Sequence, residues 1–389
     1  MTDDLEFVVA PIASLAGQVI TSAQDTLGLA FSRSEATGVR AFSSSATPLW
    51  TWCGAPLIDV ADDAIFAGAR TGFLVSLTPS GKERWRAALP DDRSAKGRER
   101  NDRGSTFIGD AIVVGDSVLT AARAEIVALA RSNGAVRARV QACRGEGGTV
   151  ARLARVGARL IATCTARSSY DDERWTPPPL EQAPAPGERR DSPGELVAYD
   201  AGLHEQWRVP VEDLSFGNGR PIALDGDTFA CVGAPIARGR IDVRRSRLVV
   251  GSAASGAIRW VRDVPGGFDR PAPVLIGDGV VAGTLPTMFS AADGAIRWTA
   301  HGGGLDDFDP RATPLVDGTR LLYAGGKALV SVALSDGASA PGPQFSTGPG
   351  WVFALARGPD GQVLVSYEGD GPHFVRLPRP TALPPRDGG

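Results

Sequence analysis

The pentapeptide Gly-Ala-Ile-Arg-Trp occurs twice in this chain, at residues 256–260 and at residues 294–298. Each copy ends a longer shared stretch, RLVVGSAASGAIRW (247–260) and TMFSAADGAIRW (287–298). In both stretches a β-rich run leads into a turn of small residues and then into the pentapeptide. Self-similarity of this kind is typical of repeat architectures. The repeat therefore guides the interpretation of the whole chain.

Five further segments share this shape with more divergence. They place the following residues at the position of the tryptophan: Phe42, Trp85, Ala138, Trp207 and Pro341. Successive positions lie 38 to 69 residues apart, which indicates a base period near 40 lengthened by insertions. A tryptophan at a fixed position of each repeat can wedge between neighbouring sheets and bury on the order of 200 Å². We expect such a structural docking role for Phe42, Trp85, Trp207, Trp260 and Trp298.

Upstream of most of these positions, two apolar runs flank an Asp/Gly turn, as in PVLIGDGVVAGT (273–284). One repeat then reads strand, tight turn, strand, strand, glycine turn, strand, which matches a β-propeller blade. The sequence predicts an all-β chain that forms a single β-propeller over residues 5–378, with eight four-stranded blades and seven as the alternative. The expected blades cover about 10–45, 50–90, 106–142, 149–212, 220–265, 272–301, 312–347 and 351–378.

The two ends of the repeat region are predicted to close the ring. The last repeat supplies three strands, and a further β-like run at residues 5–9 precedes the first blade. We expect residues 5–9 to pair with the last blade, because closure removes free sheet edges. Residues 379–389 are predicted to be a disordered tail.

Composition and charge exclude several classes of protein. Lys and Arg number 41 and Asp and Glu number 44, so no strong field attracts nucleic acid or an anionic membrane. No apolar run of about 18 residues is available for a membrane span, and the acidic start differs from a secretion signal. The four cysteines, at 53, 143, 164 and 231, form no CxxC pair. We expect a reduced, cytoplasmic protein that is monomeric on its own.

The pattern of a strand followed by Gly-x-x-x-Trp resembles the tryptophan-docking repeat of the PQQ-like (quinoprotein-type) β-propellers. The resemblance covers roughly residues 5–378 and is strongest at 65–89 and 249–298. WD40 and kelch repeats fit less well, because the Trp-Asp ending and the in-register Gly-Gly doublet are absent. The family includes alcohol and glucose dehydrogenases and the lipoprotein of an outer-membrane assembly machinery. The resemblance therefore implies a fold rather than one activity.

A dehydrogenase of this family would use an Asp base and a calcium cage of Glu, Asn and Asp, and alcohol-oxidising members also carry an adjacent-cysteine disulfide. This chain has no Cys-Cys pair, and its candidate acids fall where turns are expected, at Asp225, Asp227, Asp306, Asp307 and Asp309. Its three histidines, His204, His301 and His373, accompany no Gly-x-Ser-x-Gly elbow. We predict no catalytic residue, no metal site and no cofactor, with PQQ and calcium both considered.

Three long or charged segments are expected on one face of the propeller, at 90–106, 168–194 and 235–247. The second is a Pro-rich loop insertion with an isolated Trp175, and the third holds five arginines. Solvated loops would explain these segments. The alternative is a partner-binding surface, with an aromatic anchor and steering charge at Trp175, Arg238, Arg240, Arg244 and Arg245.

A second set of arginines lies just before the inner strands: Arg103, Arg220, Arg270 and Arg311. These residues could ring the central funnel and hold an anion, or each could pair with its neighbouring Asp and join adjacent blades. The leading hypothesis is a non-enzymatic scaffold that binds a protein partner through its loop-decorated face. The competing hypothesis is a ligand-binding or enzymatic propeller that acts at the funnel with Asp307 or Asp309.

Overall fold

The structure is a computed structural model in which strands and turns make up the described part of the chain. It describes residues 12–23, 38–45, 47–53, 57–61, 63–69, 73–89, 110–122, 124–144, 149–165, 194–211, 213–216, 222–223, 226–237, 240–242, 244–265, 272–305, 313–325, 328–344, 352–357, 363–367 and 371–375. Within these ranges no helix is long and apolar enough to cross a lipid bilayer.

The first half of the chain forms four antiparallel sheets, each with four strands in chain order. The first holds β1 (Ile12–Leu15), β2 (Gln18–Ala23), β3 (Gly38–Phe42) and β4 (Pro48–Cys53). The second holds β5 (Leu57–Ala61), β6 (Ala64–Ala69), β7 (Phe73–Leu77) and β8 (Glu83–Ala88). The third holds β9 (Ala111–Val114), β10 (Ser117–Ala122), β11 (Glu125–Ala130) and β12 (Val136–Gln141). The fourth holds β13 (Thr149–Val156), β14 (Arg159–Thr165), β15 (Gly194–Tyr199) and β16 (Glu205–Val211).

The second half repeats the pattern with additions. The fifth sheet holds β17 (Leu214–Ser215), β18 (Ile222–Ala223), β19 (Thr228–Ala237), β20 (Arg240–Ile241), β21 (Ser246–Ser252) and β22 (Ile258–Val264). The sixth holds β23 (Val274–Ile276), β24 (Gly279–Ala282), β25 (Thr287–Ser290) and β26 (Ile296–Thr299). The seventh holds β27 (His301–Gly302), β28 (Leu315–Asp317), β29 (Arg320–Gly325), β30 (Ala328–Ala333) and β31 (Ala338–Gln344). The eighth holds β32 (Val352–Arg357), β33 (Val363–Tyr367) and β34 (Gly371–Val375).

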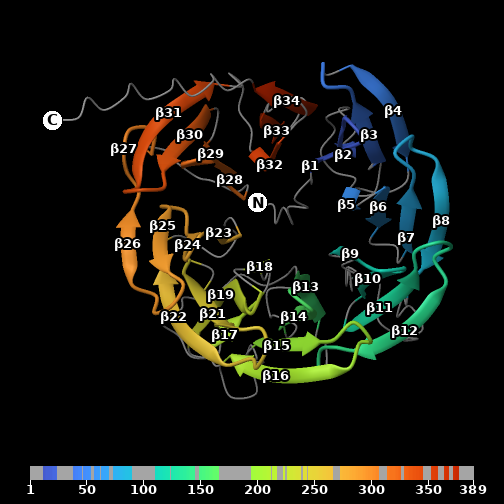
Figure 1. Ribbon diagram of the computed structural model, residues 1–389, viewed down its shortest axis with the longest axis horizontal. Helices are drawn as coiled ribbons and strands as arrows, with labels where there is room; N and C mark the ends of the chain where they lie inside the picture. Colours follow the sequence, from blue (N-terminus) through green and yellow to red (C-terminus); the bar gives the residue numbers. More distant parts are fainter. Residues whose placement is uncertain are drawn as a thin grey trace.

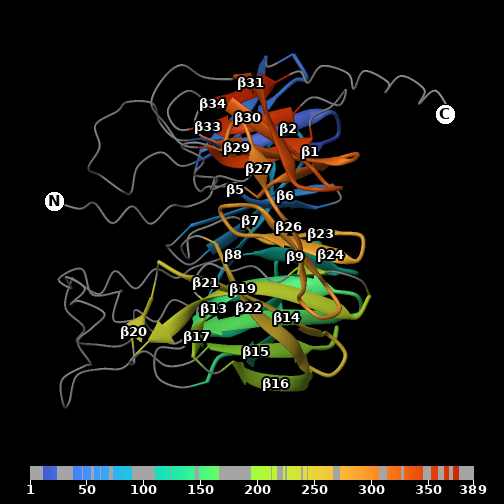
Figure 2. The same cartoon turned by 90° about the vertical axis from the view of Figure 1, so that its left-hand side faces the viewer.

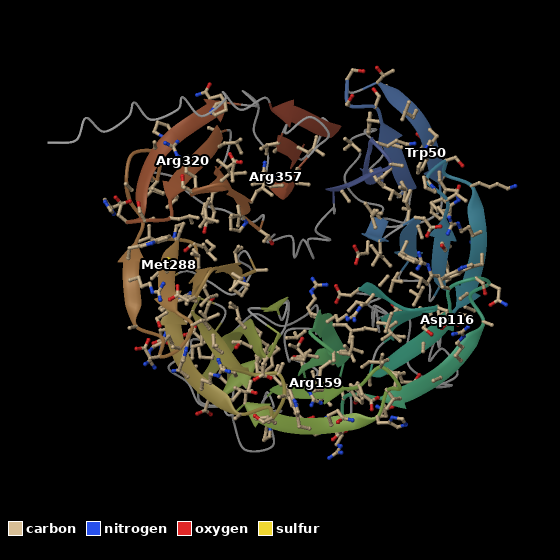
Figure 3. The ribbon with its side chains drawn as sticks, in the orientation of Figure 1. Trp50, Asp116, Arg159, Met288, Arg320 and Arg357 are labelled. Carbon is tan, nitrogen blue, oxygen red and sulfur yellow. A yellow bond between two sulfur atoms is a disulfide. The ribbon has the colours of Figure 1, made fainter. Side chains whose placement is uncertain are left out.

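The sheets stand around a common centre and make the chain an all-β propeller (Figure 1). Strands β1, β5 and β9 lie on the inner side of the ring, and β4, β8 and β12 lie on the outer side. The ring closes where β1 contacts β32 and β33, and Val19 and Leu364 share a buried cluster there. Arg357 of β32 joins the eighth sheet to the seventh near the inner side, because its Nη2 lies 2.6 Å from the Asp317 Oδ1 (Figure 3).

Alternation of residue types explains why these segments become strands. In β8 the side chains of Trp85 and Ala87 are buried, and those of Arg84, Arg86 and Ala88 are exposed. This alternation every second residue is typical of a half-buried strand. The second and third strands of each sheet read as nearly continuous apolar runs, such as SVLTAA in β10, because both of their faces pack against neighbouring sheets. The core is thus a series of layers between sheets.

Five tryptophans on outer strands join consecutive sheets in the same way. Each donates its indole N–H to a backbone carbonyl in the turn between the third and fourth strands of the next sheet, at 2.8–3.1 Å. The donor and acceptor pairs are Trp50 with Pro79, Trp85 with Arg131, Trp207 with Ala253, Trp260 with Ala291, and Trp298 with Leu334. The indole ring also covers a glycine of the same turn: Gly81, Gly134, Gly256, Gly294 and Gly337 in that order.

The structure corrects the docking residue of the first sheet. Phe42 ends the third strand, β3, and packs at the closure with Val19 and Leu364. Trp50 takes the docking position on β4, since it pairs with Ala41 just before a register shift, as Trp85 pairs with Ser76. The prediction of Phe42 was wrong because a turn follows it, with the Ser43 N–H bonded to the Thr47 carbonyl. The first sheet therefore extends to Cys53, past the predicted start of the second blade at residue 50.

The junction between the third and fourth sheets lacks a docked tryptophan. Ala138 occupies the position on β12, where it pairs with Ala128 before the register shift. In the following turn Leu203 stands where the other turns have glycine, with a φ of 62°. Its side chain is buried in a cluster with Ala128 and Tyr199. We infer that Leu203 fills the volume that an indole ring occupies at the five junctions with a docked tryptophan.

Several predictions about the chain ends fall outside the described residues. The described strands form eight sheets, and the eighth has three strands. The expected fourth strand, residues 5–9, and the expected tail, residues 379–389, are not described. The number of blades, the domain limits and the pairing of the two chain ends therefore stay predictions.

Candidate functional site

The fifth sheet carries a long hairpin that projects from one face of the ring. β19 has ten residues, and its pairing with β21 ends at Gly233 and Arg247. Beyond that point β19 pairs with β17 through Pro235 and with β20 through Ile236 and Ala237. Figure 2 shows β20 set off to one side of the other sheets. We call residues 234–247 the projecting hairpin.

Arginines dominate the returning half of the projecting hairpin, from β20 to the start of β21. Residues 240–247 contain four arginines, at 240, 244, 245 and 247, and one acid, Asp242. Asp242 is buried and shapes the turn, because its Oδ1 accepts the Arg244 N–H at 3.1 Å and its carbonyl accepts the Arg245 N–H at 3.2 Å. The carboxylate that fixes the turn is thus turned inward, while Arg244 and Arg245 are exposed.

Asp263 of β22 balances part of this charge. The Arg247 Nε lies 2.9 Å from the Asp263 Oδ1, and the Arg245 Nη2 lies 2.8 Å from its Oδ2. The hydrogen bond from Arg247, assisted by the charge of Arg245, lowers the pKa of Asp263 below its ordinary value. Arg244 pairs with no acid among the described residues. An unbalanced arginine, Arg244, therefore remains in the turn between β20 and β21.

The structure places only part of the predicted partner surface. Arg240 begins β20, and Arg244 and Arg245 follow in the next turn, so three predicted residues share one hairpin. Trp175, Arg238 and most of the insertion 168–194 lie outside the described residues. The same holds for the predicted funnel residues Arg103, Arg220, Arg270, Arg311, Asp307 and Asp309.

A buried guanidinium forms a second charged cluster at the junction of the third and fourth sheets. Arg208 of β16 lies 2.6 Å from Glu195 and 2.8 Å from Glu205, and it donates to the Ala142 carbonyl at 2.9 Å. The hydrogen bond from Arg208 lowers the pKa of Glu205. Glu195 pairs with Cys164 across β14 and β15, the two strands that flank the segment 166–193. The cluster therefore fixes the base of the predicted insertion.

One repeated ion pair was not predicted from the sequence, although its two residue types recur at fixed positions of the repeat. In four sheets an Arg one residue before the docking position pairs with an Asp in the turn between the first two strands of the same sheet. The pairs are Arg84 with Asp63, Arg137 with Asp116, Arg259 with Asp227, and Arg297 with Asp278. The sequence contained both halves, as the Asp/Gly turns and the Arg-Trp dipeptides, but not the link between them.

The two described histidines each contact a neighbouring residue of the chain. His204 is exposed and pairs with Asp200 in the same turn, at 3.1 Å. The ring of His301 lies 3.2 Å from the Thr299 carbonyl. No three His, Cys, Asp or Glu side chains gather in the described residues as a metal ion would require, so these residues do not fit a calcium cage.

Comparisons with known proteins agree with this architecture. Residues 192–341 match a family model described as outer membrane protein assembly factor BamB. BamB from Moraxella catarrhalis is similar in structure, with a TM-score of 0.60 and 16% identity over 95% of this chain and 94% of that one. The computationally designed protein Ika8 has a TM-score of 0.59 and 12% identity, over 94% and 95% of the two chains.

A europium-containing methanol dehydrogenase is also similar, with a TM-score of 0.54 and 11% identity over 91% of this chain and 81% of that chain. No curated protein matches the sequence. At these identities the likeness in structure shows the fold alone. The fold defines a β-propeller. The family match is confined to residues 192–341, where Trp207, Trp260 and Trp298 dock, and there the repeats are similar to the PQQ-like repeats that the resemblance predicted.

Proposed function

We propose that this chain is a non-enzymatic propeller scaffold that binds a protein partner through the face carrying the projecting hairpin, with no PQQ or calcium bound. The observation that supports this most is the hairpin itself. It extends beyond the pairing of β19 with β21, and it carries the exposed Arg244 and Arg245 in the turn between β20 and β21. Ala234, at the start of the extension, is buried, whereas Arg244 and Arg245 further along it are exposed.

The exposed arginines of the hairpin favour an acidic protein surface as the partner. A guanidinium group offers five N–H donors in a planar fork that matches a carboxylate. Charges at the rim of an interface also speed association with a partner of opposite sign. The net charge of the whole chain is −3, so the positive potential is local to this face. A local patch suits one protein partner better than a nucleic acid.

The family match gives independent support. The description of the matched family names an assembly factor, which is a role carried out with other proteins. The competing hypothesis, ligand binding or catalysis at the funnel, rests on Arg103, Arg220, Arg270 and Arg311, and none of these belongs to the described residues. The scaffold is therefore the proposal that the described residues support.

Affinity capture from the native host tests the proposal with a matched pair of variants. Arg244→Glu reverses the charge of an exposed arginine of the projecting hairpin. Arg139→Glu reverses an exposed arginine of the outer strand β12 and is the control. We expect the tagged wild-type chain and the control to recover one protein in equimolar amount. Arg244→Glu should reduce the affinity for that protein about tenfold, the equivalent of about 1.4 kcal/mol.

Two results would overturn the proposal. One is the absence of any stoichiometric partner with the wild-type chain. The other is equal loss of the partner with both variants, which would show that the hairpin does not contact the partner specifically. A further variant without residues 168–193 tests the predicted insertion, and retention of the partner would remove that segment from the interface.

A further inference from the structure

Two of the four cysteines meet across the junction of the third and fourth sheets. Cys143 follows β12, and Cys164 belongs to β14. Their sulfur atoms are bonded in a disulfide, and their Cα atoms are 5.4 Å apart, in the usual range for such a bond. The prediction of four separate, reduced cysteines is therefore wrong for this pair. It failed because 21 residues separate the two cysteines, and only the passage from one sheet to the next brings them together.

The disulfide is a buried part of the core. Cys143 is 1% exposed and Cys164 is 3% exposed, and both pack in the cluster that joins β10 and β11 to β14 and β15. The backbone at Cys143 is held on both sides: its N–H donates to the Ala124 carbonyl at 3.0 Å, and its carbonyl accepts the Gln141 side chain at 2.9 Å. The pair is thus shielded from a soluble reductant and held in a position for bonding.

The disulfide lies at a junction that has no docked tryptophan. It crosses the junction where Ala138 replaces the docking tryptophan. It ends beside Thr165, the last strand residue before the segment 166–193. A covalent link here holds the fourth sheet against the third where the docked tryptophan is missing, and it fixes the strand end from which residues 166–193 follow.

We propose that Cys143–Cys164 is a structural disulfide of the working protein and that the chain consequently functions in a compartment that oxidises thiols, outside the cytoplasm. Disulfides persist in such compartments and are rare where thiol reductants dominate. The bond forms when both thiols lose their protons and together pass two electrons to the disulfide of a thiol–disulfide oxidoreductase, which becomes a dithiol. The predicted cytoplasmic location rested on reduced cysteines and does not agree with this proposal.

The other two cysteines provide an internal control for a redox assay. Cys53 is exposed, and Cys231 is fully buried in β19. Cells of the native host are quenched in acid, the chain is unfolded in guanidinium, and free thiols are alkylated before and after reduction. We expect mass spectrometry to find Cys53 and Cys231 alkylated before reduction, and Cys143 and Cys164 only after reduction. Alkylation of all four before reduction would overturn the proposal.

Thermal unfolding separates a structural bond from an incidental one. We expect Cys143→Ser and Cys164→Ser, singly and together, to lower the Tm by the same amount, roughly 5 °C or more, since each removes the same cross-link. Cys53→Ser should leave the Tm unchanged. A Tm that is the same for the wild type, the variants and the reduced wild type would show that the bond stabilises nothing, which would contradict its structural role.

Discussion

Gly294 shows how one residue fixes the contact between two sheets. It lies in the second copy of Gly-Ala-Ile-Arg-Trp, and the ring that covers it is Trp260, which ends the first copy. Its φ is +72°, a conformation that L side chains rarely adopt. An added Cβ would lie 2.8 Å from the indole ring. The repeated pentapeptide is therefore conserved between the two sheets because its two ends contact each other across the junction.

Gly294→Ala tests this contact against a matched control. Gly277 also has a positive φ, +58°, but an added Cβ there would meet no atom within 4 Å. We expect Gly277→Ala to cost about 1 kcal/mol from backbone strain alone, and Gly294→Ala to cost about 1–3 kcal/mol more from overpacking against Trp260. Denaturant unfolding measures both. Equal losses would show that the indole does not depend on the glycine.

The ion pairs of Asp63 make the free energy of unfolding depend on pH. Hydrogen bonds from Arg84 and then from Arg131 lower its pKa from 3.8 to about 2, and Arg131 belongs to the next sheet. A lowered pKa in the folded state means that the pairs stabilise the protein fully above about pH 4 and lose this contribution as the pH falls toward 2. Because Asp63 is largely exposed, the contribution is about 1 kcal/mol or less.

Asp63→Asn is the corresponding test. The stability difference between the wild type and this variant should be constant from about pH 5 to 7 and should shrink as the pH approaches 2, as measured by urea unfolding. It should also shrink in 1 M salt, since the pairs are exposed. A difference that grows on acidification would contradict the assignment.

At the scale of elements, the junction between the third and fourth sheets differs from the others in a coordinated way. The missing indole at Ala138, the leucine in place of a turn glycine and the disulfide all lie at this junction. Leu203 tolerates its positive φ because its side chain gains a buried position. The two substitutions relative to the repeat therefore compensate each other.

Restoring the repeat tests this compensation. Ala138→Trp alone should overpack against Leu203, and Leu203→Gly alone should leave a cavity, each at about 1–3 kcal/mol. The double variant recreates the tryptophan–glycine dock and should be more stable than the sum of the single effects by about 1–2 kcal/mol. A double-mutant cycle from chemical denaturation measures this coupling, and additive losses would contradict it.

Much of the element pattern could be predicted from the sequence. Trp85, Trp207, Trp260 and Trp298 stand out because each follows the turn glycine, or Leu203 in its place, at a fixed distance, and a tryptophan is rare enough to mark a position. Trp50 was not predicted as a docking residue, because Gly38-Val-Arg-Ala-Phe42 resembles the pentapeptide but forms the third strand rather than the fourth. The disulfide and the hydrogen bond from Arg208 to the Ala142 carbonyl were not predictable, since the partners are 21 and 66 residues apart in sequence and meet only where the third sheet packs against the fourth.

At the scale of the molecule, the ring closes by packing of β1 against β32 and β33, without strand pairing between the two sheets among the described residues. The eighth sheet ends at β34 within them, and the predicted fourth strand is residues 5–9. Removal of residues 1–11 should lower the Tm and expose the eighth sheet to protease, because an unpaired edge is created. Removal of residues 379–389 is the control and should change neither. Equal behaviour of both truncated chains would contradict closure by the N-terminal segment.

The central claim is that the face with the projecting hairpin binds a protein. Hydrogen exchange of the chain alone and in complex with the captured partner tests it most directly, since it reports the contact residue by residue. We predict slower exchange at residues 234–247 in the complex, with unchanged exchange in the outer strands β12 and β26. Protection confined to the outer strands, or no protection at the hairpin, would contradict the account.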